Sequence, residues 1–236
     1  MAPRTPARTY FKRFEIAYDE VTRGLKVEYV VKLPEHRQIW FDQLIDGFRA
    51  EYQKWHSDPQ LEDLWKLCDQ EADITQLALC AFLHMTYDLA RVIASTLIGK
   101  SPDEWFPVYH DADYTILRAF GRSFRRPELA NSWTPIEKAT RPFVGNLLMR
   151  AFSFHILMLR ELAWRWGTKL AAAQTPSQRE KLEARLLSIF VETTRQALTQ
   201  AYWAPNKIDL MGEAVHHQLR TTDKKEARER LPLFIA

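Results

Sequence analysis

The sequence predicts an all-α fold: a single-domain antiparallel helical bundle of about seven to eight helices. Apolar residues recur at three- and four-residue steps through most of the chain, which is the helical period. Glycine is scarce, at 7 of 236 residues, and the prolines fall between the periodic segments, where helices end. Runs of alternating β-branched residues are nearly absent, and only the stretch 26–33 (KVEYVVKL) is strand-like.

Helix boundaries are marked by glycine, proline and capping residues. Ser101-Pro102-Asp103-Glu104 is a typical start, with a capping serine, proline in the first turn and acids at the positive end of the helix dipole. Pro142 is placed to break the sixth helix. No repeat or long linker divides the chain, so we expect one domain over 9–221 between loose ends at 1–8 and 222–236. The expected helices are 9–23, 36–56, 59–70, 73–98, 103–122, 135–173, 176–203 and 207–220.

Composition excludes several classes of protein. The 33 basic and 30 acidic residues are interleaved and give a net charge of only +3, which argues against nucleic-acid binding. The longest apolar run, 77–83, is too short to span a bilayer, and the first residues lack the apolar core of a secretory signal. Cys68 and Cys80 form no disulfide framework and no metal-binding spacing. We therefore expect a reduced, cytoplasmic protein with no membrane span.

The helix expected at 73–98 is nearly all apolar, so we expect it at the centre of the bundle, and it carries one narrow polar stripe. His84, Asp88, Arg91 and Ser95 step by four, three and four residues, so they share one helix face. On a helix this apolar, such a stripe indicates an internal polar pocket, although the wet side of an amphipathic helix gives the same pattern. A histidine and an aspartate at i and i+4 are placed to chelate a metal or to form a general base with its orienting carboxylate, but they also occur as an ordinary helix contact.

Other candidates lie on the next helices. His110 and Asp113 are one turn apart, and Asp113 borders an apolar face, so its carboxylate is expected to point inward. His155 falls on an apolar face, which is most often the place of a core histidine. Arg160-Glu161 lies between aliphatic residues and is often a structural ion pair in such a setting. Glu213-x-x-His216 has a spacing found in di-metal bundles, which need two such motifs.

The order of these elements resembles a mainly bacterial, all-helical domain family of uncharacterised activity. The matching segments are Tyr18-Asp-Glu-Val-Thr22 at the end of an aromatic-rich helix, His84-Met-Thr-Tyr-Asp88-Leu89 for the family's His-(Ile/Met)-x-x-Asp-Leu motif, Asp113-Tyr114, and Arg160-Glu-Leu-Ala-Trp164. The resemblance spans about residues 10–173, and at Met85 and Thr86 the family more usually has Ile and Asn. It implies an all-α fold in which His84, Asp88, Asp113 and Arg160 converge, and it implies no particular activity.

Two functional hypotheses follow. In the first, the chain is an enzyme with an aromatic-lined pocket that performs acid/base cyclisation, isomerisation or hydrolysis of an apolar small molecule in specialised metabolism. In the second, it is a non-catalytic helical binding or interaction module. A homo-oligomer and a divalent metal cofactor are left open by the sequence. For the enzyme, the candidate catalytic residues are His84, Asp88, Asp113 and Arg160; the candidate substrate-binding residues are Tyr87, Arg91, Tyr114, His155 and Trp164; and the candidate metal ligands are His84, Asp88 and His110, with His155 or Glu213 as further ligands.

Overall fold

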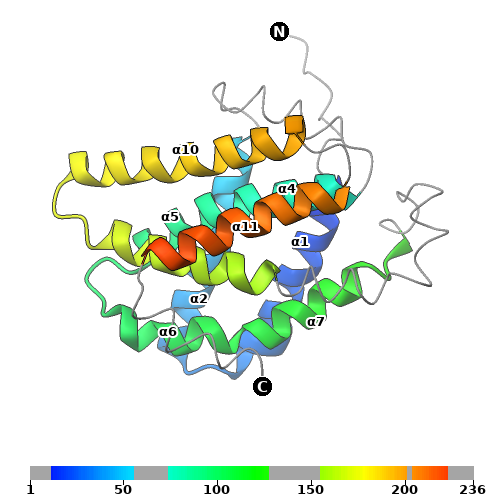
Figure 1. Cartoon of the computed structure of the whole chain (residues 1–236). Coiled ribbons are helices and arrows are strands. Elements are labelled where there is room, and N and C mark those ends of the chain that lie inside the picture. The colour runs from blue at the N-terminus through cyan, green and yellow to red at the C-terminus, as the bar shows by residue number, and fades with distance from the viewer. Residues whose placement is uncertain (1–11, 56–73, 128–154, 201–203, 223–236) are drawn as a thin grey trace, which may run out of the picture.

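The computed structural model describes residues 12–55, 74–127, 155–200 and 204–222 (Figure 1). Within these ranges the chain forms helices and no strand, which confirms the predicted all-α class. The helices expected at 59–70 and over the first part of 135–173 lie outside the described residues. The observed α-helices are α1 (Lys12–Gly24), α2 (Glu35–Trp55), α4 (Ile74–Leu83), α5 (Leu89–Thr96), α6 (Pro102–Asp111), α7 (Asp113–Ser123), the helix at 155–171, α10 (Pro176–Gln200) and α11 (Ala204–Thr222).

The expected strand-like stretch 26–33 is helical, which corrects that prediction. A π-helical turn, η2 (Leu25–Tyr29), continues α1 directly, and a 3-10 turn, η3 (Val30–Lys32), follows it. Leu25 and Val30 are buried, whereas Val27 and Val31 are exposed. Buried positions five residues apart fit a wide helical turn and do not fit the two-residue period of a strand. Continuation of α1 therefore overrides the β-branched composition of this stretch.

The helix expected at 103–122 is divided in two at Ala112, where α6 ends and α7 begins. α6 starts at Pro102, as the sequence predicted. In Figure 1, α6 and α7 run along the bottom of the view and α10 along the top, and α11 crosses the middle in front of α4 and α5. α1 packs against α7 and α4, and α2 packs against α5.

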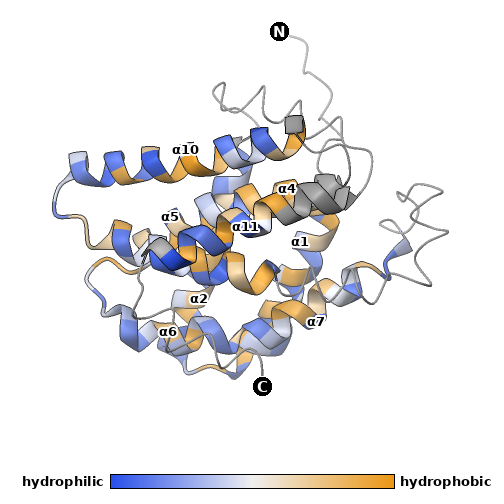
Figure 2. Ribbon diagram, in the orientation of Figure 1, coloured by the Kyte–Doolittle hydropathy of each residue, from blue (hydrophilic) through white to orange (hydrophobic). Residues whose placement is uncertain are grey.

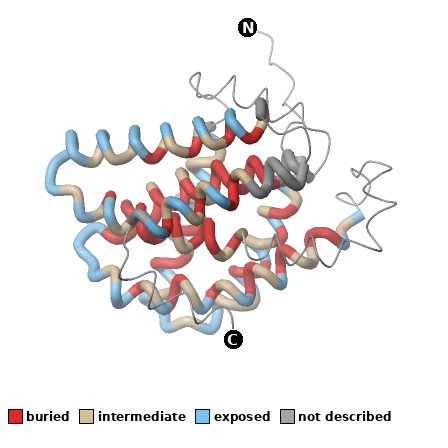
Figure 3. The backbone as a smooth tube through the Cα atoms, in the orientation of Figure 1, coloured by how far each residue is buried: buried red, intermediate tan, exposed pale blue. Residues whose placement is uncertain are grey.

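The central element runs from Ile74 to Thr96 and contains a π-helical turn, η4 (His84–Asp88), between α4 and α5. α4 contacts α1, α10 and α11, and the π turn contacts α2 and α10. Its residues are mostly apolar and buried (Figures 2 and 3), including Phe82 and Leu89. This enclosure confirms the expectation that the helix is central. It also means that the polar groups of the π turn meet protein on every side.

Two glycines let neighbouring helices approach α5 closely. A Cβ atom added at Gly47 of α2 would lie 2.8 Å from Val92 Cγ1. A Cβ atom added at Gly167 would lie 2.5 Å from Ile93 Cγ2 and 3.0 Å from the carbonyl oxygen of Ala90. The backbones of α2 and of the helix at 155–171 therefore pack directly on α5, where a side chain would separate them.

Gly167→Ala is expected to destabilise the protein by about 1–3 kcal/mol, the usual cost of overpacking a dense core. Gly121→Ala is the matched control, because Gly121 is also helical and a Cβ there meets no atom within 4 Å. The control is expected to be neutral or to stabilise by up to about 1 kcal/mol, since alanine is the better helix former. Urea unfolding midpoints of the two variants measure the difference. Equal midpoints would show that α5 is not packed in this way.

Candidate functional site

The π turn holds a buried histidine–aspartate pair. His84 is 1% exposed and Asp88 is fully buried, and the imidazole Nδ1 of His84 donates a hydrogen bond to Asp88 Oδ2. Because a carboxylate only accepts hydrogen bonds, the Nδ1 atom carries the proton in this contact. Between them, the Thr86 hydroxyl donates to the backbone carbonyl of Phe82, one turn back. Both hydrogen bonds stay within the central helix.

Four aromatic rings surround the His84 imidazole. Phe48 stacks on it at 4.0 Å between ring centroids with an interplanar angle of 14°, and the Phe14, Tyr18 and Tyr52 rings lie 5.2, 6.0 and 4.9 Å away. Two rings come from α1 and two from α2. The Nε2 atom of His84 is buried and has no hydrogen-bond partner among the described residues. A polar nitrogen left unpaired in such a setting costs free energy, so it calls for an explanation.

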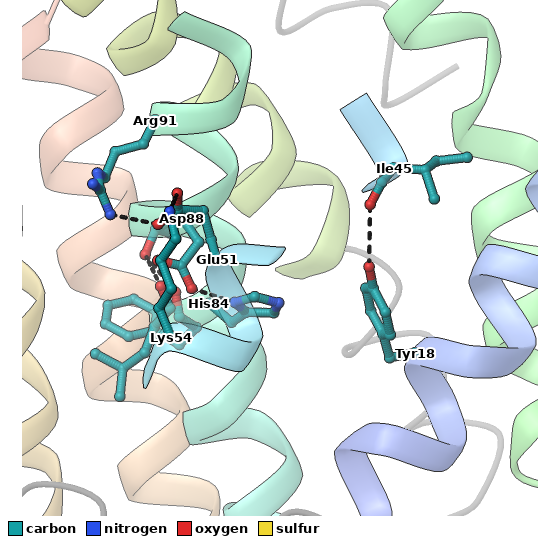
Figure 4. Close-up of polar contacts among 10 residues, drawn as sticks. Tyr18, Ile45, Glu51, Lys54, His84, Asp88 and Arg91 are labelled. Carbon is teal, nitrogen blue, oxygen red and sulfur yellow. Dashed lines mark hydrogen bonds and ion pairs between the residues drawn. The ribbon is translucent and has the colours of Figure 1, made fainter. Parts of the chain in front are cut away.

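The two tyrosine hydroxyls of this enclosure are neutral donors. Burial is the largest effect on Tyr18 and raises its pKa to about 12, despite the opposing hydrogen bond with Thr22. Burial and the nearby Glu15 carboxylate raise the pKa of Tyr52 as well. The Tyr18 hydroxyl donates to the carbonyl oxygen of Ile45 at 3.5 Å, and the Tyr52 hydroxyl donates to Glu15 Oε1 at 3.2 Å. In Figure 4, His84 lies between Asp88 on one side and Tyr18 on the other.

A cavity of about 90 Å³ lies on the other side of this aromatic wall. Phe14, Tyr18 and Phe48 line it, whereas His84 itself does not. Among the described residues, the lining contains one charged side chain, Arg160, no Asp or Glu, and the polar residues Tyr18 and Thr22. The polar stripe does not line this cavity, so the cavity is not the polar pocket that the sequence predicted. The other lining residues are apolar and come from α1, η2, α2, the central helix, α7 and the helix at 155–171: Ala17, Val21, Leu25, Phe41, Leu44, Ile45, Ala81, Met85, Leu89, Ile116, Phe120 and Ile156.

Arg160 belongs to a chain of alternating charges that runs from the cavity. Its Nε atom donates to Asp113 Oδ1 at 2.6 Å, and Asp113 Oδ2 lies 3.0 Å from His110 Nδ1. The other nitrogen of His110 lies 3.1 Å from Glu161 Oε2, and Glu161 Oε1 accepts from Arg165 Nε at 2.7 Å. The predicted inward direction of Asp113 is found here. The predicted Arg160–Glu161 ion pair is replaced by separate pairs with Asp113 and with His110 and Arg165.

This charge chain shifts the pKa of its members. Burial lowers the pKa of His110, but the hydrogen bonds with Asp113 and Glu161 outweigh it and raise that pKa to about 9. Burial raises the pKa of Asp113 and of Glu161, and their cationic partners more than offset this, so both carboxyls titrate below their ordinary range. His110 is therefore an imidazolium at neutral pH and serves as a cation between two carboxylates.

The four expected catalytic residues form two separate pairs. His84 is joined to Asp88 and Asp113 is joined to Arg160, and among the described residues no hydrogen bond or ion pair links one pair to the other. Arg160 reaches the cavity, whereas His84 lies behind the Phe14–Tyr18–Phe48 wall. The expected convergence of all four residues at one point is therefore not found: they form two separate pairs, and of the four only Arg160 lines the cavity.

The other two residues of the polar stripe, Arg91 and Ser95, are not buried in the core. Arg91 is half-buried and pairs with Glu51 at 2.6 Å and with Glu183 at 3.6 Å, while its guanidinium lies over the Tyr87 ring at 5.3 Å (Figure 4). Ser95 is exposed. A π turn advances less per residue than an α turn, so the residues after it rotate relative to those before it. Arg91 and Ser95 therefore face outward with Tyr87, and the stripe is not one internal surface.

The remaining expected substrate-binding residues lie away from this cavity. Tyr114, in the first turn of α7, is 74% exposed. An aromatic side chain in the first turn of a helix does not have to point toward the core. Trp164 is buried and packs against the Tyr109 ring at 4.9 Å. His155 is half-buried and lines a separate, smaller cavity of about 30 Å³ together with Met211 and Val215 of α11. None of the three lines the larger cavity.

The expected metal set is not formed. The described residues contain no group of three or more His, Cys, Asp or Glu side chains that could hold a metal ion. His110 is not the third ligand of His84 and Asp88, because Asp113 and Glu161 contact its two ring nitrogens. Glu213, from the single Glu-x-x-His motif, is exposed on α11.

The aromatic enclosure was missed by sequence reasoning, although the sequence carries a signal for it. Phe14 and Tyr18 stand four residues apart on α1, and Phe48 and Tyr52 stand four residues apart on α2. Side chains at i and i+4 share a helix face, so each pair presents two rings in one direction. Two such faces and a buried histidine on a third helix together make the enclosure.

Comparison of the chain with protein-family models, with curated proteins and with solved structures found no match. The resemblance to a bacterial helical family therefore stays a prediction. Among the described helices, none is both long and apolar enough to cross a membrane.

Stability should depend on the charge of His110 in a defined pH window. Because folding raises its pKa from about 6.5 to about 9, its contribution is complete below pH 6.5 and is lost as pH rises through 9. His110→Gln is therefore expected to lower the melting temperature most near pH 6, with the gap from wild type closing above pH 9. Thermal melts at several pH values measure this. A gap that widens from pH 6 to pH 10 would contradict the assigned charge.

The buried pair predicts an order of stability among stripe variants. His84→Ala removes the ring contacts and leaves Asp88 buried without its donor, so it should cost roughly 3–5 kcal/mol. Asp88→Asn keeps the shape and one acceptor and should cost less, about 1–3 kcal/mol. Ser95→Ala, at the exposed end of the stripe, is the control and should stay within about half a kcal/mol of wild type. Denaturant unfolding gives all three values, and near-wild-type results for both pair variants would show that the pair is not buried.

Proposed function

We propose that this chain binds a small, mainly apolar molecule in the 90 Å³ cavity between α1, α2 and the helix at 155–171. The observation that carries the proposal is the cavity itself: a mainly apolar space whose described wall includes Arg160, Tyr18 and Thr22. Small-molecule sites typically combine apolar walls with a few placed polar groups in this way. The proposal thus keeps the small-molecule partner expected from the sequence and assigns it to this cavity.

The energetics of the cavity favour an occupant. Protein interiors are close-packed, and an unfilled cavity costs on the order of 24 cal/mol per Å³. A cavity of 90 Å³ therefore costs about 2 kcal/mol when it is empty, which a bound apolar group would recover. The chain keeps this space at the meeting point of several helices, in a core that is otherwise dense enough for Gly47 and Gly167 to touch α5.

A second candidate function, acid/base catalysis on the bound molecule, is favoured by the His84 Nε2 atom. Asp88 holds the proton on Nδ1, so the lone pair of Nε2 is directed away from Asp88 and has no partner among the described residues. This is the arrangement of a general base with an orienting carboxylate. Reaching a ligand from Nε2 requires Phe14, Tyr18 or Phe48 to turn, because these rings separate it from the cavity. Catalysis therefore requires a rotation of one of these aromatic side chains, which binding does not require.

The expected interaction module is supported less by the described surface. Its exposed large apolar side chains are Val27, Val31, Ile39, Ile98 and Tyr114, which come from several elements. Single exposed apolar residues are normal on soluble domains and do not define a docking surface.

Filling the cavity should abolish ligand binding without unfolding the protein. Ala17 is buried on α1 and lines the cavity, so Ala17→Leu places three carbons into it. We expect wild type to bind an eight-carbon probe, 1-octanol, in isothermal titration calorimetry, and Ala17→Leu to weaken binding at least about tenfold, or roughly 1.4 kcal/mol.

Ala184→Leu, at an exposed position of α10, is the matched control and should bind 1-octanol like wild type. Circular dichroism melts verify that both variants are folded. Equal binding by wild type and folded Ala17→Leu would place the probe elsewhere and would refute this proposal.

A further inference from the structure

We infer that the ligand of this cavity carries an anionic head group, such as a carboxylate, that pairs with the Arg160 guanidinium, joined to an apolar body. The inference rests on the proposed binding function and specifies the chemical class of the ligand. It follows from how Arg160 is held, from the charge balance around it and from the polar groups of the cavity wall.

Arg160 is presented to the cavity in a fixed orientation. Its Nε atom donates to Asp113, its Nη2 atom donates to the Tyr109 carbonyl oxygen at 2.5 Å, and the guanidinium lies 4.0 Å from the Tyr109 ring centroid. The residue is only 4% exposed, so it meets protein and the cavity and little bulk water. A guanidinium has five N–H donors, and among the described residues no hydrogen bond of Nη1 is found. An anion in the cavity would therefore meet an ordered, poorly solvated guanidinium whose Nη1 atom is available to donate hydrogen bonds.

The charge chain behind Arg160 has an excess of positive charge. Arg160 pairs with Asp113, His110 pairs with Asp113 and Glu161, and Arg165 pairs with Glu161. These five groups together carry three positive charges and two negative charges. Buried charges are stable only when they are compensated, so one further negative charge would complete the balance. The cavity is the space into which such a charge can enter beside Arg160.

The remaining polar groups of the wall also suit an anion. Tyr18, with its pKa raised to about 12, stays a neutral phenol, and the Thr22 side chain beside it is also uncharged, so neither would repel an anion. Because the described part of the lining contains no carboxylate, a cationic ligand would meet the Arg160 charge there and no opposite one. The apolar wall, which includes Phe41, Leu44 and Phe120, would hold the uncharged body of the ligand. The class that fits is a mono-anionic amphiphile with an aliphatic or aromatic body.

The test compares three probes with the same eight-carbon chain on the wild-type protein: octanoate, 1-octanol and octylamine. At pH 7 their head groups are anionic, neutral and cationic. Isothermal titration calorimetry is expected to show octanoate binding roughly ten- to a hundredfold more tightly than 1-octanol, the range of one charge-assisted hydrogen bond in a dry site, with octylamine the weakest. Octanoate binding no tighter than that of 1-octanol would overturn the inference.

A charge-neutral double variant identifies Arg160 as the source of the preference. Asp113→Asn with Arg160→Gln removes both partners of the pair, so no new unpaired charge is left between them. It is expected to abolish the preference for octanoate while 1-octanol binds as before. Arg118→Gln with Glu28→Gln is the charge-neutral control, because it also removes one cation and one carboxylate that pair with each other, here with an Arg118 side chain that is 60% exposed, and it should keep the preference. A preference that survives in the folded double variant, or is lost in the control, would show that Arg160 does not select the anion.

The outcomes separate this inference from the proposal on which it rests. If Ala17→Leu weakens all probes while wild type binds octanoate and 1-octanol equally, the cavity is a ligand site and only the anionic class is wrong. If wild type binds none of the probes, or Ala17→Leu leaves every affinity unchanged, the binding function itself fails and the inference fails with it.

Discussion

The structure depends on the enclosure of the helix that runs from Ile74 to Thr96. Helices pack around it, and Gly47 and Gly167 bring two of them into direct contact with α5. A helix enclosed in this way must satisfy its polar groups within the protein. The π turn at its centre does so by joining His84 to Asp88 and by returning the Thr86 hydroxyl to the carbonyl oxygen of Phe82. The His84 Nε2 atom is the exception, and the aromatic rings of α1 and α2 close around it.

The same helices also leave a space beside this pair. Phe14, Tyr18 and Phe48 have one side toward His84 and also line the cavity, so one set of rings separates the buried base from the candidate ligand site. On the far side, Arg160 ends a chain of alternating charges that is anchored at Arg165, whose Nη1 atom donates to the Leu219 carbonyl oxygen of α11. The cavity thus lies between the aromatic wall in front of His84 and the Arg160 end of the charge chain. The Arg160 guanidinium is what favours an anionic amphiphile as the proposed ligand.

Sequence reasoning predicted the helical class, the central position of the helix around Phe82 and Leu89, and the burial of His84 and Asp88, because periodicity reports which residues face the core. It could not predict the π turns. These depend on tertiary packing, and the one at His84–Asp88 rotates Arg91 and Ser95 away from the buried pair. The strand-like stretch 26–33 was misread for a related reason, since continuation of α1 outweighed its local composition. The contact of His110 with Glu161 could not be predicted from residue spacing, because Glu161 lies 51 residues further along the chain, on another helix.

The protonation of His84 tests the central claim most directly. Long-range ¹H–¹⁵N correlation spectra of the histidine rings report which nitrogen carries a proton and how fast that proton exchanges with water. A buried pair predicts a protonated Nδ1 atom in His84 whose proton exchanges far more slowly than the ring protons of His36, an exposed histidine of α2. Fast exchange at His84, or a neutral ring with its proton on Nε2, would contradict the claim that this pair lies in the closed centre of the bundle.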